Sequence, residues 1–195
     1  KFIKKYFRKL NEFFDYNIYF AKKKNINKIY KKLSLMLSTS GSTGNKKWVK
    51  LSEDNLKSNI LAVSSYFKID EKNVTITNLP PEYTYGLSII NTHIYSGAKI
   101  ILNNFSVMQK EFWQIINKYN VESFGGVPFT YSLLKKIKFQ NLIKNTKLKY
   151  LTQAGGKLSE DMHRYLVKIL LKNKIKFYVM YGAAEATARM SILSS

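Results

Sequence analysis

Short apolar runs separated by polar turns recur along most of the chain. They are rich in Ile, Val, Leu and Phe and are typical of buried β-strands. Several end in Gly, Ser or Thr, residues that favour loops. The runs predict strands over residues 33–38, 48–51, 74–77, 98–102, 121–124, 148–152 and 175–180.

Between these runs, apolar residues recur every three or four positions, which predicts helices with one buried face. One helix should follow Ser52, whose hydroxyl can cap a helix N-terminus, and another should begin at Pro128. Two more are expected over 107–119 and from about 158 to 171. The alternation predicts an α/β fold, a layered, mostly parallel sheet flanked by helices. Ligands of such sheets collect at the carboxyl ends of the strands.

The first 33 residues have a different pattern, with apolar residues at roughly helical spacing among many lysines. Residues 1–33 are therefore expected to form a basic amphipathic helical lead-in to a domain over 34–195. We expect this segment to be a surface helix of the domain. Docking on a partner or at a membrane interface is the alternative.

Composition narrows the possible chemistry. None of the 195 residues is cysteine, which excludes a disulfide scaffold, an iron–sulfur cluster and a thiol nucleophile, and two histidines argue against a multi-histidine metal site. No apolar run approaches the roughly 18–20 residues of a membrane span, and the first residues do not resemble a signal peptide. We expect a cytoplasmic protein.

The net charge of +21 admits two interpretations. A strongly basic chain suggests nucleic acid, an anionic membrane or an acidic partner. However, only three of the 33 cationic residues are arginine, the residue best suited to bidentate phosphate and base recognition. Lysine accompanied by abundant Asn and Ile favours a compositional bias spread over solvated faces. With no nucleic-acid motif visible, we expect no specific nucleic-acid partner and keep a basic binding module as an alternative.

The loop at 38–47 carries the most specific chemical signal. It combines five hydroxyl side chains, two glycines and two lysines. Backbone N–H groups, hydroxyls and a lysine can cradle phosphate oxygens, although a flexible Ser/Gly surface loop is the alternative. The loop is not a Walker A motif, because position 46 is Lys where that pattern requires Gly.

This loop resembles the Thr-Ser-Gly-Thr/Ser-Thr-Gly-x-Pro-Lys signature of adenylate-forming enzymes, which include acyl-CoA synthetases, firefly luciferase and peptide-synthetase adenylation domains. Lys47 falls on the family's lysine, and Lys46 replaces the usual proline. The resemblance implies that the loop holds the β- and γ-phosphates of ATP. The matching residues are Thr39, Ser40, Gly41, Ser42, Thr43 and Gly44.

Further segments resemble the family in the same order. Residues 79–87 resemble its Leu-Pro-x-x-His-x-Phe/Tyr-Gly segment, which implies that Tyr83 and Tyr85 border the acyl group. Gly155 and Gly156 resemble the loop on the adenine side.

Residues 180–187 resemble the family's Tyr-Gly-x-Thr-Glu segment. There Tyr181 and Gly182 would lie beside the nucleotide, and Glu185 would hold Mg²⁺. Ala184 replaces the threonine whose hydroxyl contacts the α-phosphate. Lys47 and Glu185 are thus the expected catalytic residues, and Glu185 is also the expected metal ligand.

The implied reaction activates a small-molecule carboxylate with ATP to an acyl-adenylate. The acyl group then passes to the thiol of coenzyme A or of an acyl carrier protein's phosphopantetheine. Relatives that activate amino acids usually place Asp near position 84. This chain has Thr84 there, which favours a carboxylic acid without an amino group as the substrate.

The resemblance covers residues 34–195 and omits the family's C-terminal domain. A partial AMP-binding domain is therefore expected: a fragment, a chain complemented by a separate C-terminal domain, or a degenerate copy. A catalytically inactive nucleotide-binding remnant is the main alternative, motivated by Ala184.

Overall fold

A computed structural model describes residues 7–13, 16–21, 30–39 and 47–194, which fall into two units, Lys1–Lys32 and Leu33–Ser195. In the first unit, β1 (Phe7–Phe13) pairs antiparallel with β2 (Tyr16–Ala21). The helix expected over 1–33 is therefore wrong across these strands. Aromatic and β-branched residues such as Tyr16, Ile18 and Phe20 favour extended backbone, and this preference outweighs the helix-like spacing. The rest of residues 1–29 lies outside the described residues.

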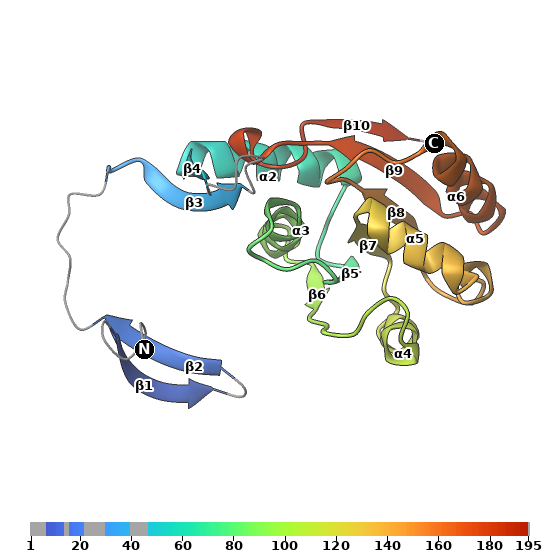
Figure 1. Cartoon of the computed structure of the whole chain (residues 1–195), viewed down its shortest axis with the longest axis horizontal. Helices are drawn as coiled ribbons and strands as arrows, with labels where there is room; N and C mark the ends of the chain where they lie inside the picture. The colour runs from blue at the N-terminus through green and yellow to red at the C-terminus, as the bar shows by residue number, and fades with distance from the viewer. Residues whose placement is uncertain (1–6, 14–15, 22–29, 40–46, 195) are drawn as a thin grey trace. The chain divides into compact units, whose positions relative to one another are not determined.

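The second unit contains the six-stranded sheet that was predicted to be mostly parallel (Figure 1). Five neighbouring strands run parallel, and the edge strand β10 alone runs antiparallel, against β9. This arrangement confirms the α/β fold class. The strand order is β10 (Ser191–Ser194), β9 (Lys176–Tyr181), β8 (Tyr150–Gln153), β7 (Ser123–Gly126), β5 (Val74–Ile76) and β6 (Lys99–Ile101).

The connections between these strands are helical. Ser52 and Ser159 cap two of the helices, each accepting a hydrogen bond from a backbone N–H three residues further on. None of the described helices is both long and apolar enough to cross a membrane. The helices are α2 (Glu53–Phe67), α3 (Thr84–Tyr95), α4 (Lys110–Lys118), α5 (Pro128–Lys136) and α6 (Glu160–Lys172), with 3₁₀ turns η1 (Phe139–Asn141) and η2 (Ala184–Ala186).

The two faces of the sheet differ in character. Successive strand residues point to opposite faces, and one face carries a purely apolar row that packs against α4, α5 and α6. That row consists of Ile76, Phe124, Leu151 and Phe177.

The opposite face carries Thr75, Ser123 and Thr152, together with a smaller apolar cluster that includes Tyr85 and Ile89 of α3. The Thr75 hydroxyl donates to the Ser123 carbonyl oxygen at 3.0 Å, so these two residues are paired within the sheet.

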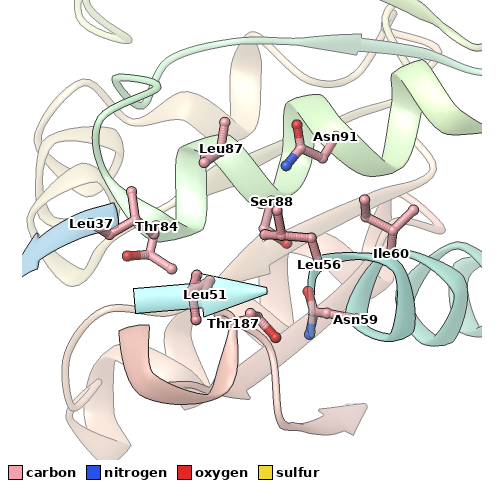
Figure 2. Close-up of a pocket in the computed structure, with 10 residues that line it drawn as sticks. All are labelled: Leu37, Leu51, Leu56, Asn59, Ile60, Thr84, Leu87, Ser88, Asn91 and Thr187. Carbon is pink, nitrogen blue, oxygen red and sulfur yellow. The ribbon is translucent and has the colours of Figure 1, made fainter. Parts of the chain in front are cut away.

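A separate antiparallel hairpin, β3 (Leu33–Thr39) and β4 (Lys47–Ser52), packs against α2 and α3. Figure 2 shows where Leu37 and Leu51 of the hairpin meet Leu56 of α2 and Leu87 of α3. The gap left among these side chains is only about 20 Å³, close to the space of one water molecule. The hairpin is therefore seated firmly, and its open end, Thr39 and Lys47, has a defined position.

We expect the apolar face to dominate stability. Phe124 is 1% exposed and packs edge-on against Phe112 and Trp113. Phe124→Ala should lower the free energy of unfolding by about 3–5 kcal/mol, measured by urea titration. Phe129→Ala is the matched control, because Phe129 is 68% exposed and should change stability by less than about 0.5 kcal/mol. Equal effects of the two substitutions would contradict this assignment of the core.

Candidate functional site

A cleft of about 230 Å³ opens where the sequence places its loops, beyond the carboxyl ends of the strands. The turns after β8 and β9 form part of its wall, the segment before α3 forms another part, and the open end of β3 completes it. Such edges of parallel sheets are where α/β proteins bind ligands. The lining residues are Ser38, Thr39, Tyr83, Thr84, Tyr85, Ala154, Gly155, Gly182, Ala183, Ala184, Ala188 and Arg189.

Tyr83 and Gly155 approach each other so closely that position 155 requires glycine. Its φ of +80° is a conformation that L side chains rarely adopt, and a Cβ atom there would collide with the Tyr83 hydroxyl. The turn is held in place by Gln153, whose Nε2 donates to the Gly156 carbonyl oxygen at 2.8 Å. The predicted acyl-side residue Tyr83 and the predicted adenine-side residue Gly155 are therefore neighbours.

Tyr85 lies beneath Tyr83 and is almost fully buried. Its hydroxyl oxygen is 2.6 Å from Thr152 Oγ1. Burial raises the pKa of Tyr85 above that of a free tyrosine, so the ring carries no charge at neutral pH. Tyr85 is thus a rigid floor of the cleft, with its hydroxyl already engaged.

A second concavity of about 560 Å³, here called the Tyr181 hollow, adjoins the cleft. Gly155 and Gly182 line both spaces, and Gly156 and Tyr181 line the hollow alone. The Tyr181 side chain is 66% exposed, so its ring is available to stack on a flat ligand. The predicted nucleotide-binding residues Gly155, Gly156, Tyr181 and Gly182 therefore share one surface.

The predicted phosphate loop is anchored beside the cleft. Thr39 lines the cleft, and Lys47 is its direct cross-strand partner at the end of the β3–β4 hairpin. The intervening predicted residues Ser40, Gly41, Ser42, Thr43 and Gly44 lie outside the described residues. The exposed Lys47 is thus placed at the base of the loop, next to the cleft wall.

The η2 turn divides the predicted tyrosine-to-glutamate segment between two surfaces. Ala183 and Ala184 line the cleft, whereas Glu185 is exposed and borders a separate hollow of about 310 Å³ with Asn55, Ser58 and Asn59. The hydroxyl of Thr187 in the same segment donates to the Asn55 carbonyl oxygen at 3.4 Å and to the Ala186 carbonyl oxygen at 2.7 Å. The structure does not bring Glu185 into the cleft with Tyr83 and Gly155.

Within the described residues, no cluster of three His, Cys, Asp or Glu side chains is placed to hold a metal ion.

Sequence reasoning missed Arg189, a buried cleft residue from the segment after η2. One signal was available, because Arg189 is one of only three arginines among 33 cationic residues. Rarity alone does not single out this position, because the equally rare Arg164 lies exposed on the surface of α6.

A family model described as "AMP-binding enzyme" matches residues 17–194 of this chain. The chain belongs to the AMP-binding enzyme family. This result confirms the resemblance drawn from the phosphate loop and the tyrosine-to-glutamate segment.

Two curated relatives are ligases of coenzyme A. The chain is 28% identical over 135 residues to "Acyl-CoA synthetase ALT10" of Alternaria alternata, covering 68% of this chain and 23% of that protein. It is 30% identical over 105 residues to "Oxalate--CoA ligase" of Arabidopsis thaliana, covering 52% of this chain and 20% of that protein. The chain therefore spans about a fifth of the length of these relatives.

Solved structures share the fold. The N-terminal domain of FACL13 from Mycobacterium tuberculosis has a TM-score of 0.71 at 18% identity, over 81% of this chain and 38% of that one. The fatty acid AMP ligase from Legionella pneumophila has a TM-score of 0.70 at 25% identity, over 82% of this chain and 30% of that one.

His93 makes the stability of this AMP-binding domain pH-dependent. Its Nδ1 lies 2.7 Å from the Ile89 carbonyl oxygen, and its Nε2 is buried without a partner among the described residues. Burial lowers the pKa of His93 to about 4, so unfolding takes up a proton between that value and the free pKa of about 6.5. The free energy of unfolding is therefore undiminished above pH 6.5, where His93 is neutral in both states, and it decreases as the pH falls towards 4.

We expect this loss to be on the order of 3 kcal/mol between pH 7 and pH 4. Urea unfolding of the parent chain and of His93→Gln across that range measures it, and the variant should show the shallower pH dependence. His163→Gln is the comparison for the other histidine. If the free energy of unfolding depends on pH equally in the parent and in His93→Gln, the pH dependence does not come from His93.

Proposed function

We propose that this chain binds ATP and a small carboxylic acid and takes part in forming an acyl-adenylate. The observation that carries the proposal is the cleft itself, where Thr39 at the end of β3 converges with Tyr83, Gly155 and Gly182 from three separate loops. These are family-matched positions, brought together at the strand ends. In the reaction, a carboxylate oxygen attacks the α-phosphorus, the bond from that phosphorus to the bridging oxygen breaks, and pyrophosphate leaves.

The phosphates belong at the open end of the β3–β4 hairpin. Lys47 would supply a counter-charge to the departing pyrophosphate, and the hydroxyls and backbone N–H groups of the adjoining loop would hold its oxygens. The tight seating of Leu37 and Leu51 supports this role, because catalysis by positioning requires the loop to start from a fixed base.

The nucleotide base and the acid occupy the two adjoining spaces. The exposed ring of Tyr181 would stack on the adenine in the Tyr181 hollow, while Tyr83 and Tyr85 would border the acyl group in the cleft. Gly155 and Gly182 lie between them, so backbone without side chains would face the point where acid and phosphate react.

Glu185 is the proposed ligand for Mg²⁺. Its carboxylate is exposed, and among the described residues it has no hydrogen bond or ion pair, so the donor is free and of the chemistry that Mg²⁺ prefers. Because the hollow beside Glu185 is separate from the cleft, this role requires the phosphate oxygens to reach the η2 turn, where a bound Mg²⁺ would neutralise their charge. The later transfer of the acyl group to coenzyme A or to a carrier-protein phosphopantetheine belongs to the same proposal.

Ala184 favours a second candidate function, nucleotide binding without turnover. A methyl group cannot replace the hydroxyl hydrogen bond to the α-phosphate that the family resemblance implies. Ala184 lines the cleft, and the Thr187 hydroxyl already donates to backbone carbonyls, so the described structure offers no replacement from that residue.

Nucleotide binding is tested at Tyr181. Tyr181→Ala should weaken AMP binding by about 1–2 kcal/mol, roughly 5- to 30-fold in Kd, because stacking on the base is lost. Isothermal titration calorimetry measures the change. Tyr95→Ala is the matched control, since Tyr95 is 60% exposed on α3 and lines neither space. Equal Kd values for parent and Tyr181→Ala would reject the stacking role.

Turnover is tested by carboxylate-dependent exchange of pyrophosphate into ATP. If Ala184 is the defect, Ala184→Thr should exchange at least about tenfold faster than the parent, because a hydroxyl bonded to a charged phosphate stabilises it by about 1.5–3 kcal/mol. Ala62→Thr, at an exposed position on α2, controls for the added hydroxyl. Rapid exchange by the parent would reject the non-catalytic alternative.

A further inference from the structure

Arg189 is a buried cation without a counter-ion in the described part of the chain. Its side chain is 7% exposed, and no described carboxylate pairs with it. Segment 40–46, outside the described residues, contains no Asp or Glu. Burying an unpaired guanidinium costs several kcal/mol, so such a group requires either strong local compensation or an anionic ligand.

Hydrogen bonds from one side of the guanidinium hold it against α3. Nε donates to Ser88 Oγ at 3.0 Å, and Nη2 donates to the Ser88 carbonyl oxygen at 3.0 Å and to Thr92 Oγ1 at 3.2 Å. The ring of Phe67 lies 5.9 Å from Cζ. These contacts use the donors of Nε and Nη2, and Nη1 makes no hydrogen bond among the described residues.

The backbone before Arg189 adopts conformations that are costly for these residue types. Thr187 has φ of 60° and Ala188 has φ of 84°, and neither is glycine. Two consecutive left-handed residues persist only where surrounding contacts enforce them, and they are characteristic of binding sites. Here Asn59 Nδ2 donates to the Arg189 carbonyl oxygen at 3.3 Å and helps hold this turn against α2.

The groups around Arg189 preserve its positive charge. Burial lowers its pKa to about 10, which leaves the guanidinium protonated at neutral pH. Its titratable neighbours Tyr85, Tyr150 and His93 are uncharged at that pH, because burial raises the pKa of both tyrosines and lowers that of the histidine. Arg189, which lines the cleft, is therefore a fixed cation among neutral titratable neighbours.

We infer that Arg189 binds a second carboxylate on the acid substrate, so that the cleft selects short dicarboxylic acids. The reacting carboxylate is the less suitable partner, because it loses its charge when it becomes a mixed anhydride with AMP. A second carboxylate keeps its charge throughout and continues to compensate the buried guanidinium. The free Nη1 supplies a charge-assisted hydrogen bond, and the cleft volume of about 230 Å³ suits a short acid. This inference rests on the proposed function of the cleft.

The test uses two hydrolytically stable acyl-adenylate analogues that differ only at the far end of the acyl group. Succinyl-sulfamoyl adenosine carries a terminal carboxylate, and succinamoyl-sulfamoyl adenosine carries a neutral amide of the same shape. Neither contains a free reacting carboxylate, so a preference between them reports the second carboxylate alone. Isothermal titration with the full chain should show at least tenfold tighter binding of the succinyl compound.

Variants of Arg189 separate recognition from folding. Arg189→Met should reduce the succinyl preference to about one, and Arg189→Lys should retain part of the preference. Arg164→Met is the control, because Arg164 lies exposed on α6 and should keep the full preference. If Arg189→Met does not fold, the comparison within the parent chain still tests for a second carboxylate, and Arg189→Lys tests whether Arg189 binds it.

The outcomes also separate this inference from the proposed function. AMP binding with equal affinity for both analogues would overturn the dicarboxylate assignment and leave the proposed function standing. If the parent chain binds both analogues equally and Arg189→Met no longer binds butanoate, Arg189 would instead be assigned to the reacting carboxylate. Failure of AMP and both analogues to bind would overturn the proposed function and this inference together.

Discussion

The site depends on the apolar packing of one face of the sheet. Ile76, Phe124, Leu151 and Phe177 bury their side chains against α4, α5 and α6, and this burial supplies the main hydrophobic stabilisation of the domain. The opposite face is therefore free to carry buried hydroxyls, and one of them, Thr152 Oγ1, lies 2.6 Å from the hydroxyl oxygen of the cleft residue Tyr85. A sheet with equally apolar faces would have no comparable row of polar groups beside the cleft.

Much of the fold followed from local pattern, and the exceptions have physical causes. Strands with dense β-branched content and α2, with its Ser52 cap, were predictable because their signals lie within a few residues. Helix α3 was harder, since Tyr83 at its N-cap makes no side-chain capping bond and two prolines precede it. Strand β10 owes its conformation to its pairing with β9, which no local pattern encodes. The β1–β2 hairpin was missed because its aromatic spacing suits both a helix and a strand.

In the candidate site too, some residues were predictable from the sequence and others were not. Gly155 and Gly182 follow strands and Tyr181 ends one, so their convergence was predictable from the rule that parallel strands end at one edge. Arg189 was not predictable, because its environment comes from Ser88, which lies 101 residues earlier in the sequence. The separation of Glu185 from the cleft arises from the η2 turn, which places adjacent residues on different surfaces.

The two glycines that border both the cleft and the Tyr181 hollow link the two spaces mechanically. Each is packed too tightly for a Cβ atom, Gly155 against Tyr83 and Gly182 against the Ala188 carbonyl oxygen, so neither position accepts a side chain. A ligand that displaces either glycine turn changes the shape of both spaces, because both spaces share these residues. Thermodynamic linkage then makes the influence mutual, and whichever ligand arrives first changes the affinity for the second by the same factor as in the reverse order.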